Sequence, residues 1–193
     1  MGFLDTLLGR SKPVQPKLDD LFALPSAAIT LEAGTGFKPT GSGSVCFRSV
    51  EGRSFTDVQK DVQDLLNMDA GKDGSLPVEV TKDDYGFTWL VSSVMSDQVE
   101  TLVTDLHAVN SSLVDAGFGP QLLCTLVAFR DEQERRLALI YLYKRGTFYP
   151  FAPKDGERRD NPLELQVKGV IGDDLKWEAD LARWFPVWGA PGL

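Results

Sequence analysis

The sequence predicts an α+β fold in which helices pack on one face of a mostly antiparallel β-sheet. The strongest helical pattern runs from Val99 to Leu113, where apolar residues recur every three or four positions. Residues 122–129 form an almost unbroken apolar run, which is typical of a central strand buried on both faces. The expected strands are joined by segments short enough for hairpins, and hairpins build antiparallel sheets.

The first residues of the chain form a segment of their own. On a short helix, four apolar side chains at spacings of i, i+1, i+4 and i+5 would share one face, and they are Phe3, Leu4, Leu7 and Leu8. Pro13 and Pro16 follow, and proline ends a helix and stiffens a linker. We therefore divide the chain into an amphipathic tail with a proline linker, 1–16, and a single α+β domain, 17–193.

The first half of the domain mixes short helices, strands and a loop. Residues 17–24 predict a short helix that Pro25 ends, and the alternation over 27–32 predicts a strand. The stretch 34–44 is rich in Gly, Ser, Thr and Pro, which predicts a loop before a strand at 45–50. The helix after that strand carries an apolar face made of Phe55, Val58, Val62, Leu65 and Leu66.

The remaining elements complete the sheet. A hairpin formed by 78–81 and 87–91 precedes the helix at 99–113, so strand-strand-helix order occurs twice and suggests a possible repeat. After the central strand, the patterns predict strands at 136–144, 148–151 and 163–170 and a short helix at 174–183.

Composition and charge narrow the function classes. Apolar residues make up 42% and charged residues 25% of the chain, which is ordinary for a globular protein. The net charge of −8 repels phosphate backbones, so we expect no nucleic-acid partner. The same charge disfavours anionic lipid, so a membrane contact would need a local feature such as the tail. No apolar stretch approaches the roughly 20 residues of a membrane span, and we expect a cytoplasmic protein.

The sequence offers no recognisable cofactor or metal site. Cys46 and Cys124 sit in apolar, strand-like runs and are predicted to be buried free thiols. Together with a single histidine they supply no metal-ligand cluster. The glycine-rich loop departs from phosphate-binding motifs, because Ser42 stands where a P-loop needs Lys and Pro39 where a dinucleotide motif needs Gly. We expect no cofactor and no metal.

His107 is the one residue that suggests general-base catalysis. It lies on the strong helix between Leu106 and Ala108, and the chain has no G-x-S-x-G nucleophile elbow. We expect a half-buried residue on the flank of the helix, and we assign no catalytic residues. An enzyme of unrecognised type stays as an alternative.

An aromatic and basic cluster near the C-terminal third is the candidate partner face. Its members are Tyr141, Tyr143, Arg145, Phe148 and Tyr149. Core packing next to a strand edge is the favoured interpretation of the cluster. Tyrosine and arginine are enriched in the energetic centres of protein interfaces, which favours a protein-binding role as the alternative.

Several long stretches are similar to one protein family. They are MGFLDTLLGRSKP at the start, DLHAVNSSLVDAGFGPQLLC from Asp105, LIYLYKRGTFYPFAP from Leu139, RRDNPLELQ from Arg158 and WFPVWGAPGL from Trp184. Together they resemble the PspA-associated protein PspAB family, over essentially the whole chain. PspA is the phage-shock protein that coats stressed membranes, and no catalytic residues are carried over from the family.

The resemblance implies a non-catalytic accessory or adaptor protein of the PspA envelope-stress response. Its partner would be PspA or a related envelope-stress protein, with a weak contact to the inner face of the cell membrane through Phe3, Leu4, Leu7 and Leu8. A chaperone-like module that binds an extended peptide along an open strand edge is the other alternative.

Overall fold

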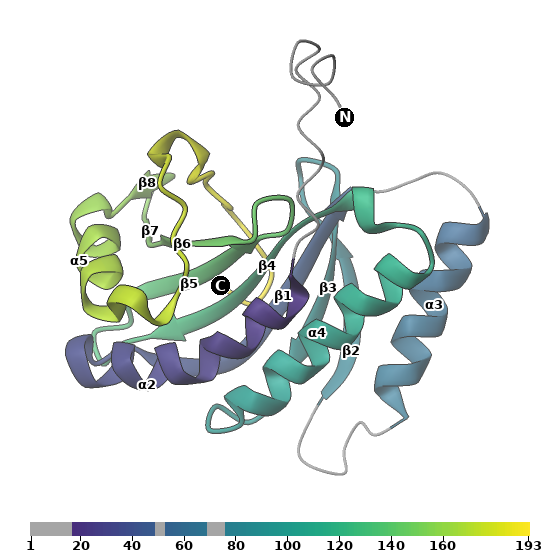
Figure 1. Cartoon of the computed structure of the whole chain (residues 1–193), viewed down its shortest axis with the longest axis horizontal. Coiled ribbons are helices and arrows are strands. Elements are labelled where there is room, and N and C mark those ends of the chain that lie inside the picture. Colours follow the sequence, from purple (N-terminus) through teal and green to yellow (C-terminus); the bar gives the residue numbers. More distant parts are fainter. Residues whose placement is uncertain (1–16, 49–52, 69–75) are drawn as a thin grey trace, which may run out of the picture.

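The computed structural model describes residues 17–48, 53–68 and 76–193, and it combines helices with a β-sheet (Figure 1). The longer helices are α2 (Leu24–Thr35), α3 (Arg53–Asn67), α4 (Val99–Asp115) and α5 (Asn161–Ile171). Short 3-10 helices are η1 (Leu18–Ala23), η2 (Gly119–Gln121), η3 (Gly172–Asp174) and η4 (Leu181–Arg183). The main strands are β1 (Lys38–Arg48), β2 (Leu76–Lys82), β3 (Phe87–Ser93), β4 (Leu122–Arg130), β5 (Arg136–Leu142) and β6 (Thr147–Phe151).

These strands form one six-stranded sheet in the order β2-β3-β1-β4-β5-β6, and every neighbouring pair is antiparallel. The predicted antiparallel sheet is thereby confirmed. A separate pair, β7 (Pro153–Lys154) and β8 (Arg158–Arg159), is also antiparallel. At the centre of the main sheet, Cys46 of β1 lies opposite Cys124 of β4.

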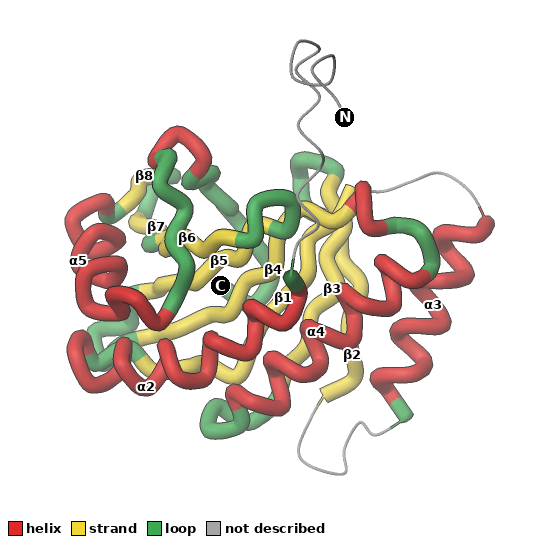
Figure 2. The backbone as a smooth tube through the Cα atoms, viewed as in Figure 1, coloured by secondary structure: helices red, strands yellow, loops and turns green. Residues whose placement is uncertain are grey.

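One face of the sheet carries the helices, as predicted. Figures 1 and 2 show α2 and α4 lying across the sheet, with α5 beside α2. Leu102 and Leu106 of α4 belong to the same buried cluster as Val45 and Phe47 of β1. Side chains of successive strand residues point to opposite faces, so only alternate residues of each strand meet these helices. The other residues need a second cover.

The C-terminal segment supplies that second cover. A second buried cluster on the opposite face joins Cys46, Leu126 and Ile140 of three strands to Trp184 and Ala190. The Tyr149 and Trp184 rings stack with their centroids 6.2 Å apart, and Phe151 meets Trp188 edge-on at 4.9 Å. The sheet is therefore buried on both faces, by helices on one and by a mostly non-helical segment on the other.

The strand predicted at 27–32 is wrong, because these residues belong to α2. Leu24, Ala27, Ala28 and Leu31 are buried at helical spacing, whereas Ile29 is 69% exposed. The sequence therefore fits both periods, and the helical one prevails. Pro25 lies in the first turn of α2, where a missing N–H costs nothing, instead of ending the helix as predicted. Without the first strand, the predicted strand-strand-helix repeat loses its first unit.

The predicted loop at 34–44 is largely the start of β1. The register of β1 against β4 shifts between Pro39 and Gly43, and Gly41 has a φ of +80°. Positive φ at a register shift is typical of a bulge built on glycine. The glycines therefore mark an irregularity within a central strand and not a connecting loop.

Residues 163–170, predicted as a strand, form most of α5. Leu163, Val167 and Ile171 are buried at spacings of four residues, and the Asp160 side chain accepts a hydrogen bond from the Leu163 N–H. The sequence Asp160-Asn161-Pro162 is a helix-start signal that the prediction missed. The predicted helix at 174–183 is also wrong, since only the short turns η3 and η4 are helical there.

The glycines of the chain allow a test of this packing. A Cβ at Gly43 would lie 2.8 Å from Leu106 Cδ1 and 2.9 Å from the Leu126 carbonyl oxygen, so α4 and β4 leave no room for it. We expect Gly43→Ala to lower the free energy of unfolding by about 1–3 kcal/mol through overpacking.

Gly169→Ala is the matched control, because its Cβ would meet nothing within 4 Å on α5. Alanine is the better helix former, so this change should raise stability by about 0.5–1 kcal/mol. Urea denaturation of both variants measures the two effects. A Gly43→Ala protein as stable as the parent would contradict the close packing of α4 on β1.

Candidate functional site

A cavity lies on the face of the sheet opposite the helices. Its volume is about 500 Å³, within the range of ~300–1,000 Å³ that is usual for ligand pockets. Its floor comes from five neighbouring strands and its roof from the C-terminal segment. The lining residues include Cys46, Trp89, Leu123, Cys124, Leu142 and Tyr149 on the floor and Phe185, Pro186, Val187 and Trp188 in the roof.

The roof is held over the cavity by backbone contacts at the edge strand β6. Phe148 donates its N–H to the Lys176 carbonyl at 2.8 Å, and the Glu178 N–H donates to the Phe148 carbonyl at 2.7 Å. The Tyr149 hydroxyl then donates to the Phe185 carbonyl at 2.8 Å. Further along, the Ser44 hydroxyl donates to the Pro191 carbonyl at 3.2 Å. The roof is thus attached to the sheet on both sides of the cavity.

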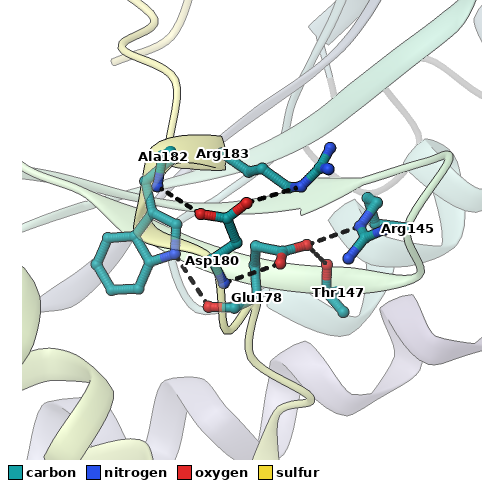
Figure 3. Close-up of polar contacts among 7 residues, drawn as sticks. Arg145, Thr147, Glu178, Asp180, Ala182 and Arg183 are labelled. Atoms are coloured by element: carbon teal, nitrogen blue, oxygen red, sulfur yellow. Dashed lines mark hydrogen bonds and ion pairs between the residues drawn. The ribbon is translucent and has the colours of Figure 1, made fainter.

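A buried carboxylate, Glu178, anchors the start of the roof (Figure 3). It accepts hydrogen bonds from Arg145 Nε at 3.0 Å, Thr147 Oγ1 at 2.9 Å and the Asp180 N–H at 3.1 Å. Burial alone would raise the pKa of Glu178, but these hydrogen bonds and the charge of Arg145 lower that pKa to about 2. Asp180 extends the network by accepting from Arg183 Nε at 3.1 Å.

The two cysteines form a facing pair at the floor of the cavity. Both are free and buried, which confirms the sequence prediction. The pKa of the Cys46 thiol is raised by its hydrogen bond to Cys124, by burial and by the negative charge of nearby Asp83. Cys46 therefore stays protonated at neutral pH, and a protonated thiol is a poor nucleophile.

Asp83 is the acidic residue of the lining, and its oxygens are engaged. Oδ1 accepts from the N–H groups of Tyr85 and Phe87 at 3.0 and 2.9 Å, and Oδ2 accepts from the Trp89 indole N–H at 2.9 Å. These bonds shape the turn between β2 and β3 and orient Trp89 over the floor. Asp83 thus has a structural role at the cavity.

His107 lies away from this cavity. It sits on α4, on the helical face of the sheet, and its Nε2 is 3.2 Å from Asp19 Oδ1. Its ring packs 4.8 Å from that of Phe22, and its side chain is 25% exposed. This agrees with the predicted half-buried position on the flank of the helix.

The structure divides the predicted partner face between the core and the surface. Tyr141, Phe148 and Tyr149 are at most 1% exposed, so these three side chains are unavailable to a partner. Tyr143 is partly buried against the core, and Arg145 is the exposed member, at the rim of the cavity. The five residues therefore do not form a continuous exposed face. The alternating pattern of the strand placed Tyr141 and Tyr143 on the same face of the sheet. It could not reveal that both faces of the sheet are covered.

Other predicted features are outside this site. Phe3, Leu4, Leu7 and Leu8, and with them the whole segment 1–16, lie outside the described residues. None of the helices in the described ranges is long and apolar enough to span a bilayer. In those same ranges, no three His, Cys, Asp or Glu side chains gather as metal ligands. The sequence reasoning missed the cavity itself, since its residues are spread from position 46 to 188.

The Glu178 network makes the roof sensitive to acid. Because its folded-state pKa lies below the unfolded value of 4.5, its stabilising effect is present above pH 4.5 and is lost as the pH falls toward 2. We expect Glu178→Gln to lower the free energy of unfolding at pH 7 by at most about 3 kcal/mol, because half-exposed Arg145 is screened by water. The variant should also lose part of the acid dependence between pH 4.5 and 2.

Denaturant unfolding at several pH values measures this effect. Glu132→Gln, at an exposed position in the turn after β4, is the matched control. If both variants kept the parent's acid profile, Glu178 would not be the anchor that its contacts indicate.

Comparison with known proteins assigns the chain to a family. A family model described as PspA associated protein B (PspAB) matches residues 1–192. Comparisons with curated proteins and with solved structures find no match. The family match confirms the resemblance that the sequence motifs indicated and covers both the cavity floor and its roof. The chain belongs to the PspA associated protein B family.

Proposed function

We propose that this chain is a non-catalytic accessory protein of the PspA envelope-stress response that binds a protein partner, PspA or a related protein. Membership of the PspAB family is the observation that carries the proposal, because the family description states an association with PspA. The net charge of −8 also favours a protein partner over nucleic acid.

The geometry of the cavity supports binding over catalysis. Its polar groups serve to hold the fold, since Asp83 orients Trp89 and Arg145 pairs with Glu178. The Cys46 thiol has a raised pKa, and His107 lies on the other side of the sheet. An enzyme would need an activated nucleophile or base beside the cavity. The lining residues instead suit the retention of a bound group.

The strand edges do not favour the chaperone-like alternative. At β6, residues 176–178 already pair with Phe148. At β2, Asn67 Oδ1 accepts from the Val78 N–H and Gln63 Nε2 donates to the Val78 carbonyl, both at 2.7 Å. A peptide that adds a strand needs unpaired backbone groups along such an edge.

The tail would supply a second, weaker contact. Full burial of Phe3, Leu4, Leu7 and Leu8 would stabilise binding by roughly 1.5–3 kcal/mol each, reduced by partial insertion and by the cost of ordering the segment. Such a contact is reversible, so we propose a cytoplasmic protein that visits the inner face of the membrane.

A binding assay with purified PspA tests the proposal. We expect the full chain to retain PspA at micromolar concentration and a deletion of residues 1–12 to bind more weakly, because the domain and the tail both contribute. An unrelated acidic protein of similar size is the control. Absence of binding at tens of micromolar would contradict the adaptor role.

Co-sedimentation with vesicles tests the membrane contact separately. We expect the full chain to pellet partly with vesicles and Leu4→Asp/Leu7→Asp to stay in solution, since charge on the apolar stripe opposes insertion. Asp5→Asn, off the stripe, should pellet like the parent. Equal pelleting of the parent and the stripe variant would remove the membrane contact from the proposal.

A further inference from the structure

The cavity has an apolar interior whose deepest polar atoms are already paired. The Tyr149 hydroxyl donates to the roof, and the Trp89 indole N–H donates to Asp83. The remaining floor presents thiols and aliphatic side chains, among them Leu123 and Leu142. An occupant therefore gains by burying apolar surface and not by forming hydrogen bonds in the interior.

The shape of the floor favours an elongated occupant. It draws residues from β3, β1, β4, β5 and β6, which are consecutive in the sheet. Four spacings of about 4.8 Å between neighbouring strands make a floor roughly 19 Å wide. That distance suits an extended acyl chain better than a single ring.

The rim of the cavity carries three cationic side chains, although the chain as a whole is acidic. Lys144 and Arg145 follow β5, and Arg183 lies in η4 at the start of the roof. Arg145 and Arg183 pair with Glu178 and Asp180, which are not lining residues, and keep side chains 48% and 47% exposed. Lys144 is exposed and forms no ion pair within the described part of the chain. Asp83 is the one acidic residue among the lining residues.

We propose that the cavity binds an amphipathic small molecule with a single acyl chain and an anionic head group, such as a fatty acid. The acyl chain lies over Cys46 and Cys124, beneath Val187 and Trp188. The head group lies at the rim among Lys144, Arg145 and Arg183, where guanidinium N–H groups remaining beyond the Nε contacts can donate to a carboxylate. This inference does not depend on PspA binding.

The two cavity thiols provide a specific readout, because the chain has no other cysteine. Laurate, below its micellar concentration, is added to the full chain, and the rate of thiol alkylation is followed by mass spectrometry. At a laurate concentration ten times its Kd, alkylation of Cys124, which at 8% is the more exposed of the two thiols, should slow about tenfold. Dodecyltrimethylammonium has the same chain length and the opposite charge, and it should give much weaker protection.

Two pairs of variants test where the head group and the acyl chain of the ligand lie. Lys144→Glu/Arg183→Glu should weaken laurate binding at least tenfold, whereas Arg130→Glu, an exposed cation outside the cavity, should leave it unchanged. Leu142→Trp should fill the cavity and abolish protection, and Leu165→Trp, at a 53% exposed position on α5, should not. The charge variants change only exposed side chains, so they keep the test valid if Leu142→Trp does not fold.

The other outcomes overturn the proposal. Equal protection by laurate and by dodecyltrimethylammonium would show that the cavity does not select an anionic head group. Absence of protection by either compound would show that the cavity does not bind such a ligand. Faster alkylation of ligand-free Phe3→Asp/Leu7→Asp than of the parent would identify the chain's own tail as the occupant. Protection by purified PspA without any effect of laurate would make the cavity a protein-docking site.

Discussion

The sheet of this protein carries apolar side chains on both faces, and this constraint governs the rest of the structure. Alternate residues of β4 and β5 point in opposite directions, and both sets are buried. Helices cover one face, and their apolar side chains are buried against it. The other face is covered by a segment that is mostly neither helix nor strand, so its contact with the sheet is incomplete. The cavity of about 500 Å³ is the space that this incomplete cover leaves.

A cover without regular structure needs other contacts to satisfy its backbone and hold its position. Buried carboxylates serve this purpose at both ends of β6. Glu178 accepts from Arg145 and Thr147, and Glu164 accepts from the Ala152 N–H and from Arg159 Nε at 2.9 Å each. Arg159 in turn donates to the Trp184 carbonyl. Each carboxylate is paired and hydrogen-bonded, which offsets the cost of removing it from water. Arg145, which holds the start of the roof through Glu178, also lies at the rim of the cavity.

The two faces of the sheet also differ in what they offer to a ligand. On the face under the C-terminal segment, the described residues provide an apolar space with charged groups at its rim, which suits the amphipathic ligand proposed above. The helical face, with His107 beside Asp19, is separated from that space by the sheet.

The local sequence pattern was enough to predict the helix α4, the central strand β4 and the hairpin of β2 and β3, because each of these segments fits one period only. These elements together were enough to predict the α+β class. The resemblance of several long motifs was enough for the family, and the apolar runs around Cys46 and Cys124 were enough to predict two buried free thiols. The local pattern failed where one segment satisfied two periods, as in 27–32, and where helix-start residues outweighed an apolar run, as in α5. The facing of Cys46 and Cys124, the burial of Tyr141 and the whole cavity were decided by tertiary structure alone. These features depend on which distant segment covers which face of the sheet, and no local periodicity contains that information.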